Sequence, residues 1–181
     1  MDKETMHALK EVVYTRIIEY LDIEGYPTEG TLDFKVANIS DLVLYTIGPI
    51  LQHVRKMGRN IRLTREKVIA SVDDEAGGNE EFVVMDWIVI GDDKFVLVVE
   101  AKRTSTRKGK KQILLAMKDA WENNTGGVIY GFVTTGEDWR MLTYDGAEFM
   151  MINKLTVVFN MMEEEKEKWM KENSLYGCCI D

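Results

Sequence analysis

The fold is decided by residues 82–102, which read FVVMDWIVIGDDKFVLVVEAK. The runs 82–90 and 95–99 are rich in β-branched and aromatic residues, as strands usually are. Between them, the segment 91–94 contains Gly, two Asp and Lys, which is typical of a hairpin turn. We therefore expect two antiparallel strands here, the second of which leads into Glu100.

Three charged residues interrupt this apolar hairpin. Asp86 lies within the first run, and Glu100 and Lys102 end the second. A charge near a core is costly unless it is paired or bound to a metal, so these side chains are candidates for function. Strand alternation puts Glu100 and Lys102 on the same side of their strand.

The register of the hairpin decides whether Asp86 joins the other two. Residues directly opposite each other in an antiparallel pair project to the same face. A three-residue loop of 92–94 puts Asp86 opposite Glu100, whereas a two-residue loop of 92–93 puts it opposite Val99. A shared site therefore requires an odd loop or a bulge.

Three converging side chains of this kind form a chemically coherent site. Two carboxylates supply the hard oxygen ligands that Mg²⁺ and Mn²⁺ prefer. The bound cation would polarise a phosphoryl oxygen and acidify a water molecule, and Lys102 would orient or deprotonate that water. If the three side chains converge, such a site needs no covalent intermediate.

The order of these residues resembles a known signature. Asp86, a short hairpin and then Glu100-Ala101-Lys102 are similar to the D-x(n)-(D/E)-x-K pattern of PD-(D/E)xK nucleases. The resemblance covers about residues 40–145 and implies a restriction-endonuclease-like α/β fold, with helices flanking a mixed central sheet. Met85 stands where the namesake proline would be. The segment 133–139 also resembles fungal nuclease-like domains related to Crinkler effectors.

The resemblance implies a role for each residue of the signature. Asp86 and Glu100 would bind the metal together with the backbone carbonyl of Ala101, and Lys102 would assist the attacking water. In the family, an acid on a preceding helix often completes the site, and by position this acid is Asp41. Relatives with the signature include restriction endonucleases, archaeal-type Holliday junction resolvases and RecB-type domains.

Charge patterning suggests where nucleic acid would bind. The net charge is −8, which opposes passive coating of DNA. Basic residues nevertheless gather in 51–67, with six Lys or Arg, and in 102–118, with seven. Such windows fit a phosphate-binding face, and equally a solvated helix face. We expect the second window to contact nucleic acid, DNA more than RNA. Gln112 in this window resembles a glutamine that is often found on the following helix in RecB-like members. The expected contact residues are Arg103, Arg107, Lys108, Lys110, Lys111 and Gln112.

The rest of the chain completes one α/β domain over 1–181. Helical periodicity predicts helices over 3–21, 40–57, 108–123 and 163–172, the second capped by Ser40 and kinked at Gly48-Pro49. Further strands are predicted over 67–72, 128–134 and 139–144. The domain then divides into N-terminal helices (1–60), a catalytic core (about 61–146) and a C-terminal extension (147–181). Within the core, the strand–helix–strand segment 95–134 is expected to form a parallel crossover.

The sequence also predicts cellular location and assembly. No apolar stretch is long enough for a transmembrane helix, and the N-terminus is unlike a secretory signal. Adjacent Cys178 and Cys179 cannot staple a fold. We therefore expect an intracellular protein without a membrane partner. A homodimer is a further expectation, because resolvase-like relatives act as two-fold dimers.

Several functions are compatible with these residues. The leading hypothesis is a Mg²⁺- or Mn²⁺-dependent endonuclease, or a nuclease that is selective for nucleic-acid structure. One alternative is an inactive module on the same fold that binds nucleic acid or protein, which the negative net charge favours. Another is a phosphoesterase acting on RNA or small nucleotides. In a purely structural interpretation, Glu100 and Lys102 form a salt bridge at a strand end and Asp86 faces solvent.

Overall fold

The structure is a computed structural model that describes most of the chain. The described residues are 2–26, 35–69, 78–87, 93–102, 107–124, 126–159 and 161–171. At residues 67–69, 78–81, 87, 93 and 107–109 it describes the backbone alone.

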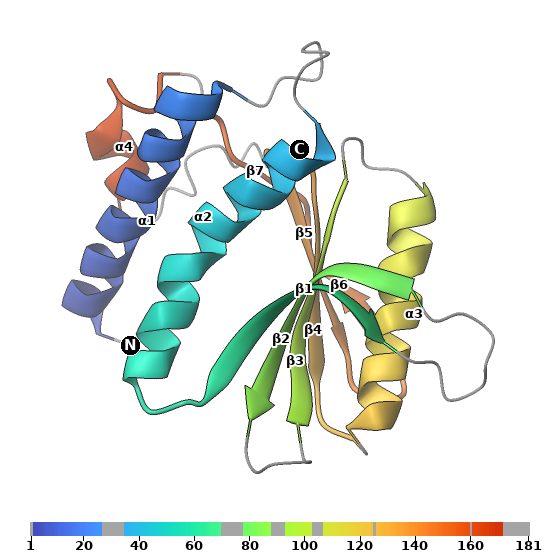
Figure 1. Cartoon of the computed structure of the whole chain (residues 1–181). Coiled ribbons are helices and arrows are strands. Elements are labelled where there is room, and N and C mark those ends of the chain that lie inside the picture. Colours follow the sequence, from blue (N-terminus) through green and yellow to red (C-terminus); the bar gives the residue numbers. More distant parts are fainter. Residues whose placement is uncertain are drawn as a thin grey trace.

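A seven-stranded sheet forms the centre of the described part (Figure 1). Its strands are β1 (Ile61–Ile69), β2 (Gly78–Trp87), β3 (Asp93–Ala101), β4 (Ile129–Thr134), β5 (Asp138–Tyr144), β6 (Phe149–Met151) and β7 (Leu155–Thr156). The strand order is β1-β2-β3-β4-β5-β6, and β7 pairs with β5. The β3–β4 pair is parallel and the other pairs are antiparallel. The predicted mixed sheet is therefore confirmed.

Helices cover both faces of this sheet. The helices are α1 (Lys3–Glu24), α2 (Val36–Lys56), α3 (Arg107–Asn123) and the short α4 (Lys166–Met170). Figure 1 shows α1 and α2 on one side of the sheet and α3 on the other. We call these sides the α1/α2 face and the α3 face. Because α3 connects the parallel strands β3 and β4, it is the predicted crossover.

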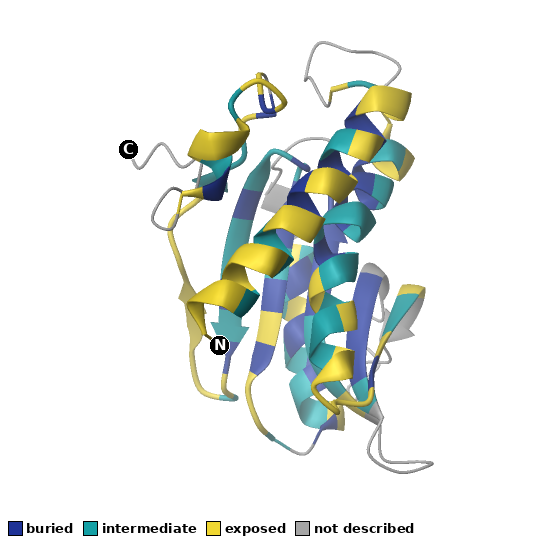
Figure 2. Cartoon of the chain, turned by 90° about the vertical axis from the view of Figure 1, so that its left-hand side faces the viewer, coloured by how far each residue is buried: buried dark blue, intermediate teal, exposed yellow. Residues whose placement is uncertain are grey.

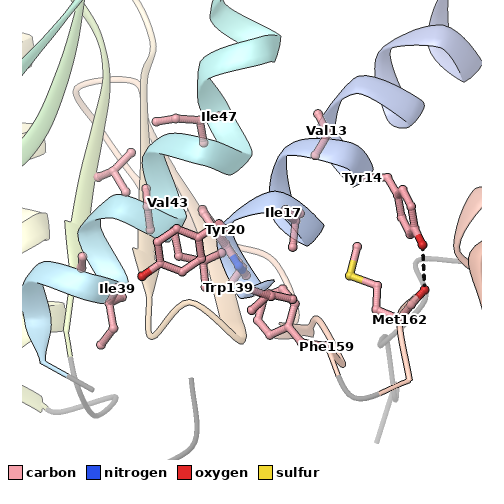
Figure 3. Packing of buried hydrophobic residues seen from close by; sticks show 14 of the residues in the cluster. Val13, Tyr14, Ile17, Tyr20, Ile39, Val43, Ile47, Trp139, Phe159 and Met162 are labelled. Atoms are coloured by element: carbon pink, nitrogen blue, oxygen red, sulfur yellow. Dashed lines mark hydrogen bonds between the residues drawn. The ribbon is translucent and has the colours of Figure 1, made fainter. Parts of the chain in front are cut away.

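The core on the α1/α2 face joins both ends of the chain. Ile17 of α1 and Val43 of α2 are almost completely buried and pack together with Phe159 and Met162 from the C-terminal segment. The hydroxyl of Tyr14 donates a hydrogen bond of 3.1 Å to the carbonyl oxygen of Met162 (Figure 3). The outward surfaces of α1 and α2 are largely exposed (Figure 2). The C-terminal segment thus belongs to the same core as the two N-terminal helices.

Among the described residues, the core on the α3 face has fewer buried residues than the core on the α1/α2 face. Ile113 and Met117 of α3 are fully buried against Val83 of β2 and Val98 of β3. Gly131 of β4 lies directly beneath α3, and a Cβ atom at this position would be 2.4 Å from the sulfur of Met117. A glycine in β4 therefore allows the helix to approach the sheet closely.

Several element boundaries differ from those predicted. Helix α2 begins at Val36, not near Ser40. Ser40 is buried inside the first turns of the helix, where its hydroxyl donates to the carbonyl oxygen of Val36. The prediction of Ser40 as an N-cap is therefore wrong. Pro49 lies inside α2. Strand β1 begins at Ile61, six residues before the predicted start, and the short strands β6 and β7 were not predicted.

Candidate functional site

The β2–β3 hairpin has a register different from the one that the site requires. Asp86 lies opposite Lys94, and Phe82 lies opposite Val99. The pairing shifts between Val84 and Met85, where Val96 is the extra residue on β3. A bulge is thus present, as predicted, but it does not bring Asp86 to Glu100.

The prediction that Asp86 and Glu100 share a metal is therefore wrong for this structure. Glu100 lies six residues beyond Lys94, the partner of Asp86, which corresponds to roughly 20 Å along β3. The two acids also occupy opposite faces. Glu100 is two residues from Val98 of the α3-face core and is therefore on the α3 face. Asp86 directly follows Met85, another residue of that core, and is therefore on the α1/α2 face.

Burial of the hairpin explains this register. Phe82 packs in the α1/α2-face core with Val99, and Val83 packs in the α3-face core with Val98. A register with Asp86 opposite Glu100 would place Phe82 beyond the end of β3 and remove its strand partner. Pairing buried residues with buried residues outweighs bringing the charges together.

Asp86 has a structural partner instead of a catalytic one. Its carboxylate accepts a hydrogen bond of 2.5 Å from the guanidinium of Arg59, in the segment after α2. The Asp86 side chain is 14 % exposed and the Arg59 side chain 62 % exposed. This ion pair neutralises an acid at the edge of the core and links β2 to the end of α2.

Glu100 is the buried carboxylate of the hairpin. Its side chain is 2 % exposed, at the end of β3 next to β4. One carboxylate oxygen, Oε1, pairs with the ammonium group of Lys102, whose side chain is 32 % exposed. The other oxygen, Oε2, has no hydrogen-bond partner among the described residues. A buried carboxylate oxygen without a donor is costly, so Glu100 is a candidate ligand position among the described residues.

Backbone contacts hold this strand end in place. The amide of Lys102 donates a hydrogen bond of 2.9 Å to the carbonyl oxygen of Thr134. Ala101 lies opposite Thr134 in the parallel β3–β4 pair, and both residues are buried. The predicted neighbours Glu100, Ala101 and Lys102 are thus brought together on a fixed strand end, as expected for a site that must be rigid.

An acid that was not predicted lies near Glu100 in the sheet. The last pair of the β2–β3 ladder is Phe82–Val99, so the next residues along the two strands are Glu81 and Glu100. Glu81 was overlooked because the strand was expected to begin at Phe82. Aligning the apolar runs of the two strands residue by residue would have identified this position.

The predicted helix acid Asp41 is not part of the Glu100 site, and this prediction is wrong. Asp41 lies on α2, across the sheet from the face of Glu100. Its carboxylate forms an ion pair of 3.1 Å with Arg65 of β1. Both side chains are about half exposed, so Asp41 links α2 to the edge of the sheet.

The predicted nucleic-acid contacts lie on or before α3. Arg103 lies outside the described residues, and Arg107 and Lys108 are in the first turn of α3, described by their backbone. Lys110 and Gln112 are partly exposed and Lys111 is exposed. Because α3 returns the chain between parallel strands, its N-terminus lies at the same end of the sheet as Glu100.

Two further properties of the described residues concern metal binding and membranes. No cluster of three or more His, Cys, Asp or Glu side chains is arranged to hold a metal within the part of the chain whose side chains are described. No described helix is both long and apolar enough to cross a bilayer.

Comparison with protein-family models, curated proteins and solved structures finds no match for this chain.

Proposed function

We propose that the chain hydrolyses phosphodiester bonds of nucleic acid with the help of Mg²⁺ or Mn²⁺ at Glu100, as a PD-(D/E)xK-like nuclease. The observation that carries this proposal is the Glu100 carboxylate, which is 2 % exposed, paired with Lys102 through one oxygen and without a described donor at the other. Carboxylate and carbonyl oxygens suit these two cations, so Glu100 and the Ala101 carbonyl are fitting ligands.

A second acid strengthens this proposal. Glu81 and Glu100 directly follow the last pair of the β2–β3 ladder, so their backbone positions are neighbours on adjacent strands. We therefore assign to Glu81 the ligand role that the sequence pattern gave to Asp86.

Lys102 would act on the attacking water. Its side chain is one third exposed, whereas the carboxylate that it contacts is buried. The ammonium group is thus held between solvent and the buried acid, where it can orient a water molecule and stabilise a phosphoryl oxygen. The cation would supply charge neutralisation and a more acidic water.

The N-terminus of α3 would receive the phosphate groups. It lies at the same end of the sheet as Glu100, and the helix begins with Arg107-Lys108 and continues to Lys110-Lys111. A helix N-terminus carries partial positive charge and binds anions, and the basic side chains add to this field. Such contacts position the backbone of a nucleic acid without reading its sequence.

Cleavage of DNA tests the proposal. We expect the protein to cut linear or branched DNA with Mg²⁺ or Mn²⁺ and not with EDTA. Glu100→Gln, Glu81→Gln and Lys102→Ala should each lower the rate by at least about a hundredfold. Glu148→Gln, at an exposed position of the β5–β6 turn, is the matched control. Equal rates for Glu100→Gln and wild type would refute the proposal.

A non-catalytic binding module is the second candidate. The observation that favours it is the Arg59–Asp86 ion pair, which holds the acid of the sequence signature away from Glu100. In that case, DNA binding would persist with either cation, and no cleavage would be observed for wild type on linear or branched substrates.

A further inference from the structure

A groove outside the Glu100 site lies between α1, α2 and β1. Its volume is about 880 Å³, within the range of about 300–1,000 Å³ typical of ligand sites. Its walls come from Val12 and Arg16 of α1, from residues between 44 and 56 of α2 and from residues 61–63 of β1. Figure 1 shows α2 leading into β1 with α1 alongside. These three elements bring together residues that are far apart in the sequence.

The charge of this groove is opposite to that of the whole protein. Four basic residues line it, namely Arg16, Arg55, Lys56 and Arg62, and no Asp or Glu is among its described lining residues. Arg16 pairs with Glu19 at 3.2 Å, beside the groove. In a chain of net charge −8, such a concentration of positive charge favours an anionic ligand.

The remaining walls of the groove are apolar and include an aromatic ring. Leu44, Tyr45, Leu51 and Leu63 line it and are partly buried against the α1/α2-face core. The ring of Tyr45 is fixed by a tilted contact with Tyr20, 5.2 Å between centroids. A ligand with flat apolar groups and phosphates would match both parts of this surface, because bases stack on aromatic rings while cations hold the backbone.

We propose that this groove binds a single-stranded segment of nucleic acid. Arg55, Lys56 and Arg62 hold its phosphates and a base packs against Tyr45. The inference rests on the proposed function only in taking nucleic acid as the ligand. The groove would be a second region of the protein that contacts the nucleic acid, on the opposite face of the sheet from Glu100.

Strand β1 connects the groove with the end of the sheet that carries Glu100. Arg65 is two residues beyond Leu63, or about 7 Å along the strand. It lies opposite Phe82, which in turn lies opposite Val99. A nucleic-acid strand that leaves the groove along this edge would pass Arg65, which is paired with Asp41, before it reaches the level of Glu100.

Binding without metal tests this inference separately from cleavage. The probes are a fluorescein-labelled DNA strand of about twelve nucleotides, the RNA strand of the same sequence and the blunt DNA duplex. Fluorescence anisotropy in EDTA compares wild type with Arg55→Glu/Lys56→Glu and with Tyr45→Leu. The control is Lys10→Glu/Lys171→Glu, which has the same charge change at the α1–α4 contact. Circular dichroism establishes that each variant is folded.

The groove variants should bind both single strands at least about tenfold more weakly. The charge reversal should also lower the slope of log K against log salt by roughly 1.4, for two lost phosphate contacts. The control should stay within about twofold of wild type. Equal loss in the control, no loss in the groove variants, or tighter binding of the duplex than of either strand would overturn the inference. Absent cleavage with groove-dependent binding would refute the proposed hydrolysis and leave this inference standing.

Discussion

At the scale of single residues, the two acids of the hairpin have separate roles. Asp86→Asn should keep metal-dependent cleavage, because Asp86 pairs with Arg59 and lies about 20 Å from Glu100 along the sheet. Its cost should be at most about 1 kcal/mol of folding stability, as for a pair with one exposed partner. Cleavage assays and thermal unfolding measure both effects.

Metal-induced stabilisation provides an independent measurement. Mg²⁺ or Mn²⁺ should raise the Tm of wild type and of Asp86→Asn, because a ligand of the folded state shifts the unfolding equilibrium. It should not raise the Tm of Glu100→Gln. An Asp86→Asn protein that has lost both cleavage and the Tm shift would show that Asp86 is a ligand after all.

A second residue-scale prediction concerns Gly131. Gly131→Ala should lower stability by about 1–3 kcal/mol, because the new Cβ would approach the sulfur of Met117 to 2.4 Å in a packed core. Chemical denaturation measures the loss. In a Met117→Ala background, the same substitution should cost less, since the contacted sulfur is gone. Equal costs in both backgrounds would mean that Met117 is not the obstacle.

At the scale of elements, Tyr20 links α1 to α2 and makes their packing sensitive to alkaline pH. Its hydroxyl donates a hydrogen bond of 2.6 Å to the carbonyl oxygen of Asn38. Burial, and then the negative charges of Glu24 and Asp41, raise the pKa of Tyr20. A raised pKa means that the stability contributed by the neutral phenol is complete below about pH 10 and is lost as the pH rises further.

Tyr20→Phe should therefore have opposite effects in two pH ranges. At neutral pH it should cost about 1 kcal/mol through the lost hydrogen bond. Above pH 10 its stability should fall less steeply than that of wild type, because there is no phenol to ionise. Urea unfolding at several pH values measures this. Parallel pH profiles for Tyr20→Phe and wild type, with the exposed Tyr130→Phe as control, would contradict it.

The same scale shows what the sequence can predict. Helix α1, helix α3 and strand β4 have clear periodicity or continuous apolar runs, and their predicted bounds agree closely with the structure. The first six residues of β1, 61–66, include Arg62, Thr64, Arg65 and Glu66 and only two apolar residues, so the sequence pattern predicts no strand before residue 67. Local pattern therefore predicts an element when its apolar face is dense and fails when charged residues dilute it.

The candidate site also has some features that local sequence pattern predicts and others that it does not. The proximity of Glu100 and Lys102 follows from strand alternation, which is local. The partner of Glu100 on β2 depends on register, which is fixed by the burial of Phe82 and Val83 on opposite faces and by the bulge at Val96. The basic groove depends on contacts between three elements. These two features require tertiary packing, which one sequence does not reveal.

At the scale of the whole molecule, two cores share one sheet and should unfold together. Ile17→Ala on the α1/α2 face and Ile113→Ala on the α3 face each remove a buried side chain. Each should cost about 2–5 kcal/mol and lower the midpoint of one common transition. Circular dichroism and tryptophan fluorescence should give coincident curves for both variants. Two separate transitions in either variant would show that the faces unfold independently.

The bulge in β3 also determines which shortenings of the chain the hairpin tolerates. Val96 is the residue that β2 does not match, so its removal would leave Phe95 opposite Met85 and Leu97 opposite Val84 in an uninterrupted ladder. Removal of Val98 would instead move every residue of β3 on one side of the deletion from the α1/α2 face to the α3 face, or the reverse. Length variation among natural or engineered versions of this hairpin should therefore concentrate at position 96.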